Sequence, residues 1–96
     1  MEKKIQLLRP AGKKAVRMDI DKYTVIKKAL LNSLKQNKEL THTELLDMVI
    51  DNFKKNKIKF EGSIEWYMES VKLDLEANKI IERVYDKSKL KFRLAK

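Results

Sequence analysis

The sequence predicts an α+β fold of three helices flanked by two short strand pairs. Apolar residues recur every three or four positions in three central segments, which is the period of a helix. Residues 90–94 instead alternate apolar and basic side chains, which is the period of a strand. With 96 residues and a hydrophobic fraction of 43%, the chain can form one core. We therefore expect a single domain over residues 1–96, with a β-ribbon or arm at 1–18, a three-helix core at 19–78 and a final strand pair at 79–96.

Strand-like runs occur at both ends of the chain. Residues 5–8 and 15–18 lie on either side of a segment with the only proline of the chain, which favours a turn. Residues 80–85 and 90–94 are separated by the polar turn-forming residues 86–89. We expect each of these two regions to form an antiparallel strand pair.

The first two helices are predicted from their capping residues. Asp19 or Asp21 can cap a helix that runs to about Gln36. Thr41 and Glu44 have the spacing of a capping box, in which each side chain accepts a hydrogen bond from the other residue's backbone N–H group. The second helix is therefore expected to begin near residue 42.

Polar residues 54–57 are expected to end the second helix. Ser63 is a suitable N-cap for a third helix over residues 64–77. Asn78 is expected to take the left-handed conformation that stops this helix, because its short amide tolerates positive φ better than most side chains.

Three helices followed by a two-stranded hairpin is the order of elements in winged helix-turn-helix proteins, whose hairpin is called the wing. Residues 62–77 read Gly-Ser-Ile-Glu-Trp-Tyr-Met-Glu-Ser-Val-Lys-Leu-Asp-Leu-Glu-Ala, which resembles the signature of a small uncharacterised bacterial winged-helix family. The resemblance extends to the basic ribbon, to the helix start at Asp19 and Tyr23, and to the isoleucine-rich and basic final strands. It implies a winged helix-turn-helix fold and no particular activity.

A net charge of +9 and a pI near 9.8 favour a polyanionic partner, which we expect to be double-stranded DNA. A lysine bias can also arise from genome composition, so the distribution of charge matters more than the total. Residues 1–17 and 80–96 are strongly basic, whereas residues 61–79 are acidic overall. The basic ends point to phosphate contacts from the wing and from an N-terminal arm, as in DNA-binding proteins that regulate transcription.

The candidate nucleic-acid-binding residues come from three places. The wing contributes basic residues that can face the phosphate backbone, namely Arg83, Lys87, Lys89, Lys91 and Arg93. The arm contributes Lys13 and Lys14. The third helix contributes outward residues that could lie in a major groove, namely Ser63, Trp66, Ser70 and Lys72.

The third helix also carries the main objection to DNA binding. We expect Glu65, Glu69, Lys72 and Glu76 to point outward, and carboxylates there repel phosphates unless a basic neighbour engages them, as Lys72 could engage Glu69 at i,i+3 spacing. The alternative function is therefore a protein–protein interaction module that uses this acidic helix and its aromatic Trp66. Reversing the charge of Glu65 and Glu69 distinguishes the two interpretations.

The sequence holds no pattern of an active or metal site. His42 is the only histidine, there is no cysteine, and Glu65 and Glu69 have the i,i+4 spacing of any exposed helical face. The serines lack a glycine-rich elbow and there is no phosphate loop. We expect no enzyme activity, no metal and no cofactor. Without an export signal or a long apolar run we expect a soluble cytoplasmic protein that does not enter membranes, while a homodimer or a protein partner stays open.

Overall fold

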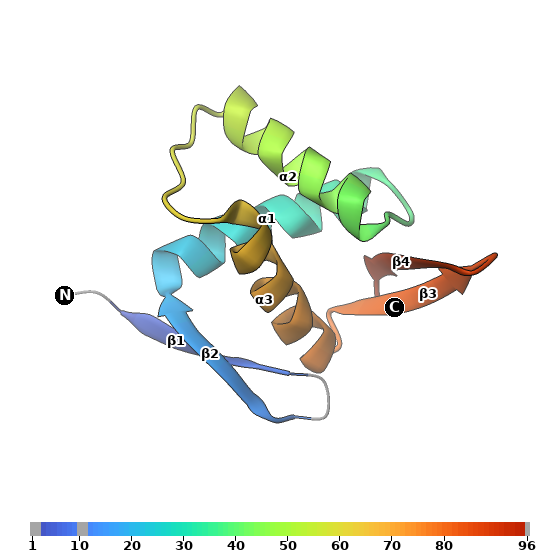
Figure 1. The fold of residues 1–96 in the computed structure, drawn as a ribbon, viewed down its shortest axis with the longest axis horizontal. Coiled ribbons are helices and arrows are strands. Elements are labelled where there is room, and N and C mark those ends of the chain that lie inside the picture. Colours follow the sequence, from blue (N-terminus) through green and yellow to red (C-terminus); the bar gives the residue numbers. More distant parts are fainter. Residues whose placement is uncertain (1–2, 10–11, 96) are drawn as a thin grey trace.

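The computed structural model describes residues 3–9 and 12–95. Pro10 and Ala11, at the centre of the predicted N-terminal turn, therefore lie outside the described residues. Within the described residues, three helices and two small antiparallel strand pairs confirm the predicted α+β class (Figure 1). In chain order the elements are β1 (Lys4–Leu8), β2 (Lys14–Asp19), α1 (Ile20–Gln36), α2 (His42–Lys55), α3 (Ile64–Ala77), β3 (Ile81–Asp86) and β4 (Lys89–Leu94).

The predicted helix caps are present. The Asp19 carboxylate accepts a hydrogen bond from the Asp21 backbone N–H group at 2.8 Å and starts α1. The capping box is reciprocal, because the Thr41 hydroxyl oxygen accepts from the Glu44 N–H group at 3.2 Å and the Glu44 carboxylate accepts from the Thr41 N–H group at 2.8 Å. These bonds hold the pKa of Glu44 below its ordinary value. Ser63 caps α3 by accepting from the Trp66 N–H group at 3.2 Å.

The end of α3 differs from the prediction. Asn78 has a negative φ of −88°, and the left-handed residue is Lys79, with φ of 59°. The Asn78 side-chain amide donates to the Asp74 carbonyl oxygen at 2.9 Å and its backbone N–H group donates to the same carbonyl, so Asn78 continues the last turn. The expectation for Asn78 was wrong by one residue, and β3 accordingly begins at Ile81 rather than at residue 80.

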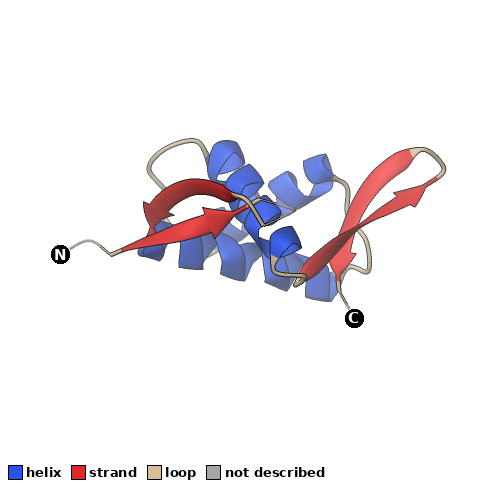
Figure 2. Ribbon diagram, turned by 90° about the horizontal axis from the view of Figure 1, so that it is seen from below, coloured by secondary structure: helices blue, strands red, loops and turns tan. Residues whose placement is uncertain are grey.

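The two strand pairs form separate sheets that flank α3, as Figures 1 and 2 show. We call β1–β2 the ribbon and β3–β4 the hairpin. Leu40, which lies before α2, pairs with Phe92 on the outer edge of β4. The Leu40 N–H group donates to the Phe92 carbonyl at 3.0 Å, and the Phe92 N–H group donates back at 2.7 Å. The hairpin is thereby joined to the segment that leads into α2.

The core takes side chains from all three helices and from both strand pairs. Its fully buried members include Leu7, Ile26, Leu30, Leu45, Val49, Met68, Leu75 and Phe92. In the described part of the chain, every buried side-chain nitrogen and oxygen atom has a hydrogen-bond partner, as stable interiors require.

A buried carboxylate on α3 ties the ribbon and α1 to the core. Asp74 is buried, and its Oδ1 atom accepts a hydrogen bond from the Leu8 backbone N–H group at 2.8 Å. Its Oδ2 atom accepts from the Tyr23 hydroxyl at 2.7 Å. Burial, and then the neighbouring Asp74, raise the pKa of Tyr23 well above its ordinary value, so this hydroxyl stays a donor.

The turn of the hairpin contains two residues in an unfavourable backbone conformation. Lys87 and Ser88 have φ values of 49° and 71°, as a two-residue type I′ turn requires, although asparagine and glycine suit these positions better. We expect the double substitution Lys87→Asn with Ser88→Gly to raise the free energy of unfolding by about 1 kcal/mol, measured by urea denaturation. Lys87→Gln removes the same charge without relieving the turn, so an equal gain from that control would contradict the backbone explanation.

Candidate nucleic-acid interface

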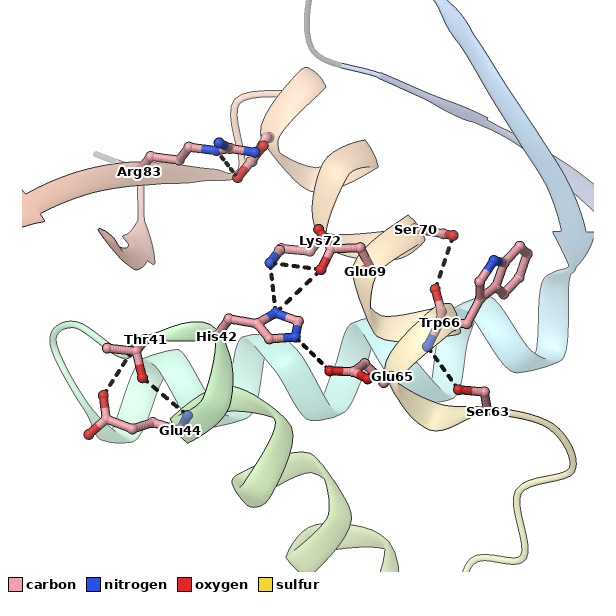
Figure 3. Close-up of polar contacts among 11 residues, drawn as sticks. Thr41, His42, Glu44, Ser63, Glu65, Trp66, Glu69, Ser70, Lys72 and Arg83 are labelled. Carbon is pink, nitrogen blue, oxygen red and sulfur yellow. Dashed lines mark hydrogen bonds and ion pairs between the residues drawn. The ribbon is translucent and has the colours of Figure 1, made fainter. Parts of the chain in front are cut away.

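The acidic side chains of α3 are engaged by basic groups of three elements (Figure 3). The His42 Nε2 atom lies 3.1 Å from the Glu65 Oε2 atom, and its Nδ1 atom lies 3.3 Å from the Glu69 Oε2 atom. The Lys72 Nζ atom lies 3.3 Å from the same Glu69 oxygen and 3.0 Å from His42 Nδ1. We call these four residues the His42 cluster. It joins the start of α2 to the middle of α3.

Lys72 is not the outward residue that we expected. Its side chain is only 3% exposed, because residue 72 lies beside the buried positions Val71 and Leu75 and its stem covers the core. Its ammonium group lies 4.1 Å from the centre of the Phe92 ring. Burial lowers the pKa of Lys72, while Glu69 opposes this effect. Lys72 therefore neutralises Glu69, as predicted for this i,i+3 pair, and is not available to DNA.

Glu76 is also engaged rather than free. Its side chain is 7% exposed, and its Oε1 atom accepts a hydrogen bond from Arg83 Nε at 2.8 Å. This bond raises the pKa of Arg83 above its ordinary value, against the opposing effect of burial. Arg83 thus serves to hold β3 against α3, so the expectation that it lies with the other basic residues of the hairpin was wrong.

Strand register divides the basic residues of the hairpin between its two faces. Cross-strand partners share a face, which places Arg83 with Phe92 on the core side and Lys89, Lys91 and Arg93 together on the opposite side. Two of the latter are paired with carboxylates. Arg93 Nε donates to Glu82 at 2.6 Å, and Lys91 Nζ lies 3.4 Å from Asp86.

The tip of the hairpin carries the accessible positive charge. Lys87 and Lys89 are exposed, and neither has an ion-pair partner among the residues that the structure describes. The hairpin therefore offers two accessible ammonium groups at its tip and two paired basic groups along one face.

Lys13 and Lys14 lie at the turn end of the ribbon and are both exposed. The Leu8–Asp74 hydrogen bond holds this end of the ribbon beside the C-terminal half of α3. Because the hairpin starts just after α3, basic side chains lie on both sides of that helix.

The remaining candidates on α3 mainly serve the helix itself. The Ser63 oxygen caps α3, and the Ser70 hydroxyl donates to the Trp66 carbonyl oxygen at 3.1 Å. Trp66 is 49% exposed and rests edge-on against Tyr67, with ring centres 5.0 Å apart. Trp66, Ser70 and Leu73 form an outward stripe of α3 at helical spacing, beside the carboxylates of the His42 cluster.

Sequence reasoning missed the partners of His42. The sequence does not place a carboxylate beside His42, because Glu65 and Glu69 come from a helix that begins 22 residues later in the numbering. The available signal was the position of His42 at the first turn of α2, next to the capping box. No group of three or more His, Cys, Asp or Glu side chains in the described residues could hold a metal ion.

None of the helices in the described ranges combines the length and the apolar character that a membrane span needs.

The fold and this surface define a small α+β domain that presents basic strand pairs on either side of a helix whose glutamates are engaged by His42, Lys72 and Arg83. The chain belongs to the family of unknown function DUF6958, whose model matches residues 4–92. The resemblance to an uncharacterised family is thus confirmed, and it extends over nearly the whole chain. Neither a curated protein nor a solved structure gives a significant match.

Proposed function

We propose that this chain is a winged-helix DNA-binding domain that holds the phosphate backbone through the tip of its hairpin and the turn end of its ribbon. A role in regulating transcription follows from the usual use of such domains. The order of helices and hairpin supports the winged-helix assignment. The Leu40–Phe92 bridge supports it too, because it pairs one residue before α2 with β4, as a third strand of the wing would.

The observation that carries this proposal is the engagement of the α3 carboxylates. Glu65 and Glu69 are held by His42 and Lys72, and Glu76 is held by Arg83. Each pairing reduces the repulsion that an acidic helix would exert on a phosphate backbone. This supports an approach of α3 to DNA that the sequence alone argued against.

The proposed phosphate contacts come from groups that have no competing ion-pair partner within residues 3–9 and 12–95. Lys87 and Lys89 at the hairpin tip can bind phosphates without first breaking an ion pair among the described residues, whereas Lys91 and Arg93 must exchange theirs. Lys13 and Lys14 supply positive charge on the other side of α3. Such contacts position a protein on DNA without reading its sequence.

The proposal is tested by measuring the affinity for a random-sequence duplex as salt is raised from about 50 mM, where phosphate contacts dominate. We expect the double variant Lys87→Ala with Lys89→Ala to reduce the log–log salt slope by about 1.8, at about 0.9 for each lost contact. The matched control is Lys54→Ala with Lys55→Ala, which removes the same charge from the distant end of α2 (Figure 1).

Equal losses in the two double variants would mean that binding depends on total charge and would overturn the assigned role of the hairpin tip. Absence of binding by the unmodified chain at about 50 mM salt would overturn the DNA-binding proposal itself.

The half-exposed Trp66 favours a second candidate, a protein–protein interaction module built on α3. Because Trp66 is the only tryptophan, its fluorescence reports on α3 alone. If α3 faces DNA, adding duplex should change this emission in proportion to binding. Binding with no change in emission would leave the outward stripe of α3 free for a protein partner.

A further inference from the structure

The His42 ring has two different sets of partners, depending on its protonation. With a neutral ring, the Nε2–H group donates to Glu65 at 3.1 Å and Nδ1 accepts from the Lys72 ammonium group at 3.0 Å (Figure 3). In this state the His42 cluster carries two carboxylates and one ammonium group, so its net charge is negative.

Protonation requires a different arrangement. An Nδ1–H group cannot accept a hydrogen bond from Lys72, and two positive groups would then lie 3.0 Å apart. The Glu69 Oε2 atom lies 3.3 Å from Nδ1 and provides the acceptor that the protonated ring needs. Lys72 keeps its own contact with that oxygen while its ammonium group turns away from the protonated ring. The cluster then has two carboxylates and two cations and is neutral.

We infer that His42 makes DNA binding by this domain depend on pH, with affinity rising as the ring gains a proton. The inference rests on the proposed function, because the cluster lies on the side of α3 that faces the start of α2 and the hairpin, next to Phe92 of β4. Protonation removes the negative charge of the cluster, and with it the repulsion between α3 and the phosphate backbone.

The surroundings of the ring support assigning this response to His42. Glu65, Glu69 and Lys72 face it from α3, and Glu44 lies two residues further along α2 itself. From the hairpin, Arg83 interacts with Glu69. Imidazole is the side chain that ordinarily titrates between pH 5 and 8, and the sequence contains one histidine.

The test measures duplex affinity between about pH 5.5 and 7.5, the window in which imidazole titrates, at constant ionic strength. One proton limits the change to about tenfold per pH unit, and we expect a total gain of about threefold to tenfold on acidification. His42→Gln retains a donor and an acceptor but does not titrate, so its affinity should stay nearly constant over this range. Lys87→Ala is the control that weakens binding while keeping the pH response.

A second measurement does not depend on the variant folding. By linkage, DNA must move the titration midpoint of the His42 ring, followed by its NMR signals, to higher pH. Binding without a pH response, or an equal response in His42→Gln, would overturn the inference and leave the proposed function intact. Absence of binding at every pH would overturn both.

Discussion

Replacing Phe92 by alanine is expected to lower the free energy of unfolding by about 3–5 kcal/mol, the range for removing a buried phenylalanine. Phe92 is 1% exposed, and its ring meets the Lys72 ammonium group on one side and the core on the other. The substitution therefore leaves a cavity and also removes the aromatic face that accommodates a buried cation.

Urea denaturation of Phe92→Ala, Phe92→Leu and the unmodified chain measures this effect. Leucine retains much of the apolar volume, so the second variant should lose clearly less stability than the first. Tyr85→Ala is the matched control, because Tyr85 lies on the same face of the hairpin but is 73% exposed, and its change should stay within about 0.5 kcal/mol. A loss below about 1 kcal/mol in Phe92→Ala would show that the hairpin is not part of the cooperative core.

The second large effect is expected at Asp74. Asp74→Ala leaves the Leu8 N–H group and the Tyr23 hydroxyl without their acceptor, and each unsatisfied buried donor costs about 1–3 kcal/mol. We expect a loss of about 3 kcal/mol in the free energy of unfolding. Hydrogen exchange should show faster exchange at Leu8 than elsewhere in β1, because its N–H group loses the Asp74 carboxylate that accepts its hydrogen bond.

Two further variants separate the hydrogen bonds of Asp74 from its charge. Asp74→Asn keeps one carbonyl oxygen for Leu8, and its amide can donate to the Tyr23 oxygen, so its loss should be smaller. Asp51→Ala removes an exposed carboxylate from α2 and should change stability little. Equal losses at positions 74 and 51 would mean that net charge, and not the buried hydrogen bonds, determines the effect.

Residues close together in the sequence were sufficient to predict where the helices begin. Thr41, Glu44 and Ser63 cap the helices as predicted, because a cap depends on residues within one turn of each other. The error at Asn78 was of the same local kind: its amide donates to the Asp74 carbonyl oxygen, so the left-handed residue is Lys79, one position later.

The candidate site depended on contacts that local signals do not contain. Lys72 was expected to point outward because it follows the outward positions Glu65 and Glu69 at helical spacing. In the structure, Phe92 of the hairpin packs against its side chain and buries it. His42 finds its carboxylates only once α2 and α3 pack together. The pairing of Leu40 with Phe92 likewise requires the hairpin to fold back beside the α1–α2 connection. These contacts follow from tertiary packing, which is why a single sequence with correct helix periods did not predict them.

The bonds that close this fold also determine how it must form. The Leu8–Asp74 bond and the Leu40–Phe92 bridge each join residues more than fifty positions apart in the chain. Loop-closure entropy opposes such contacts until most of the chain has already collapsed, so folding is expected to be slower than in helical bundles of this size, where contacts are mainly local. No helix pair of this domain contains its own complete core, because β1 and β4 supply Leu7 and Phe92 from opposite ends. The domain should accordingly unfold in one step, with the ribbon, the helices and the hairpin losing their structure together.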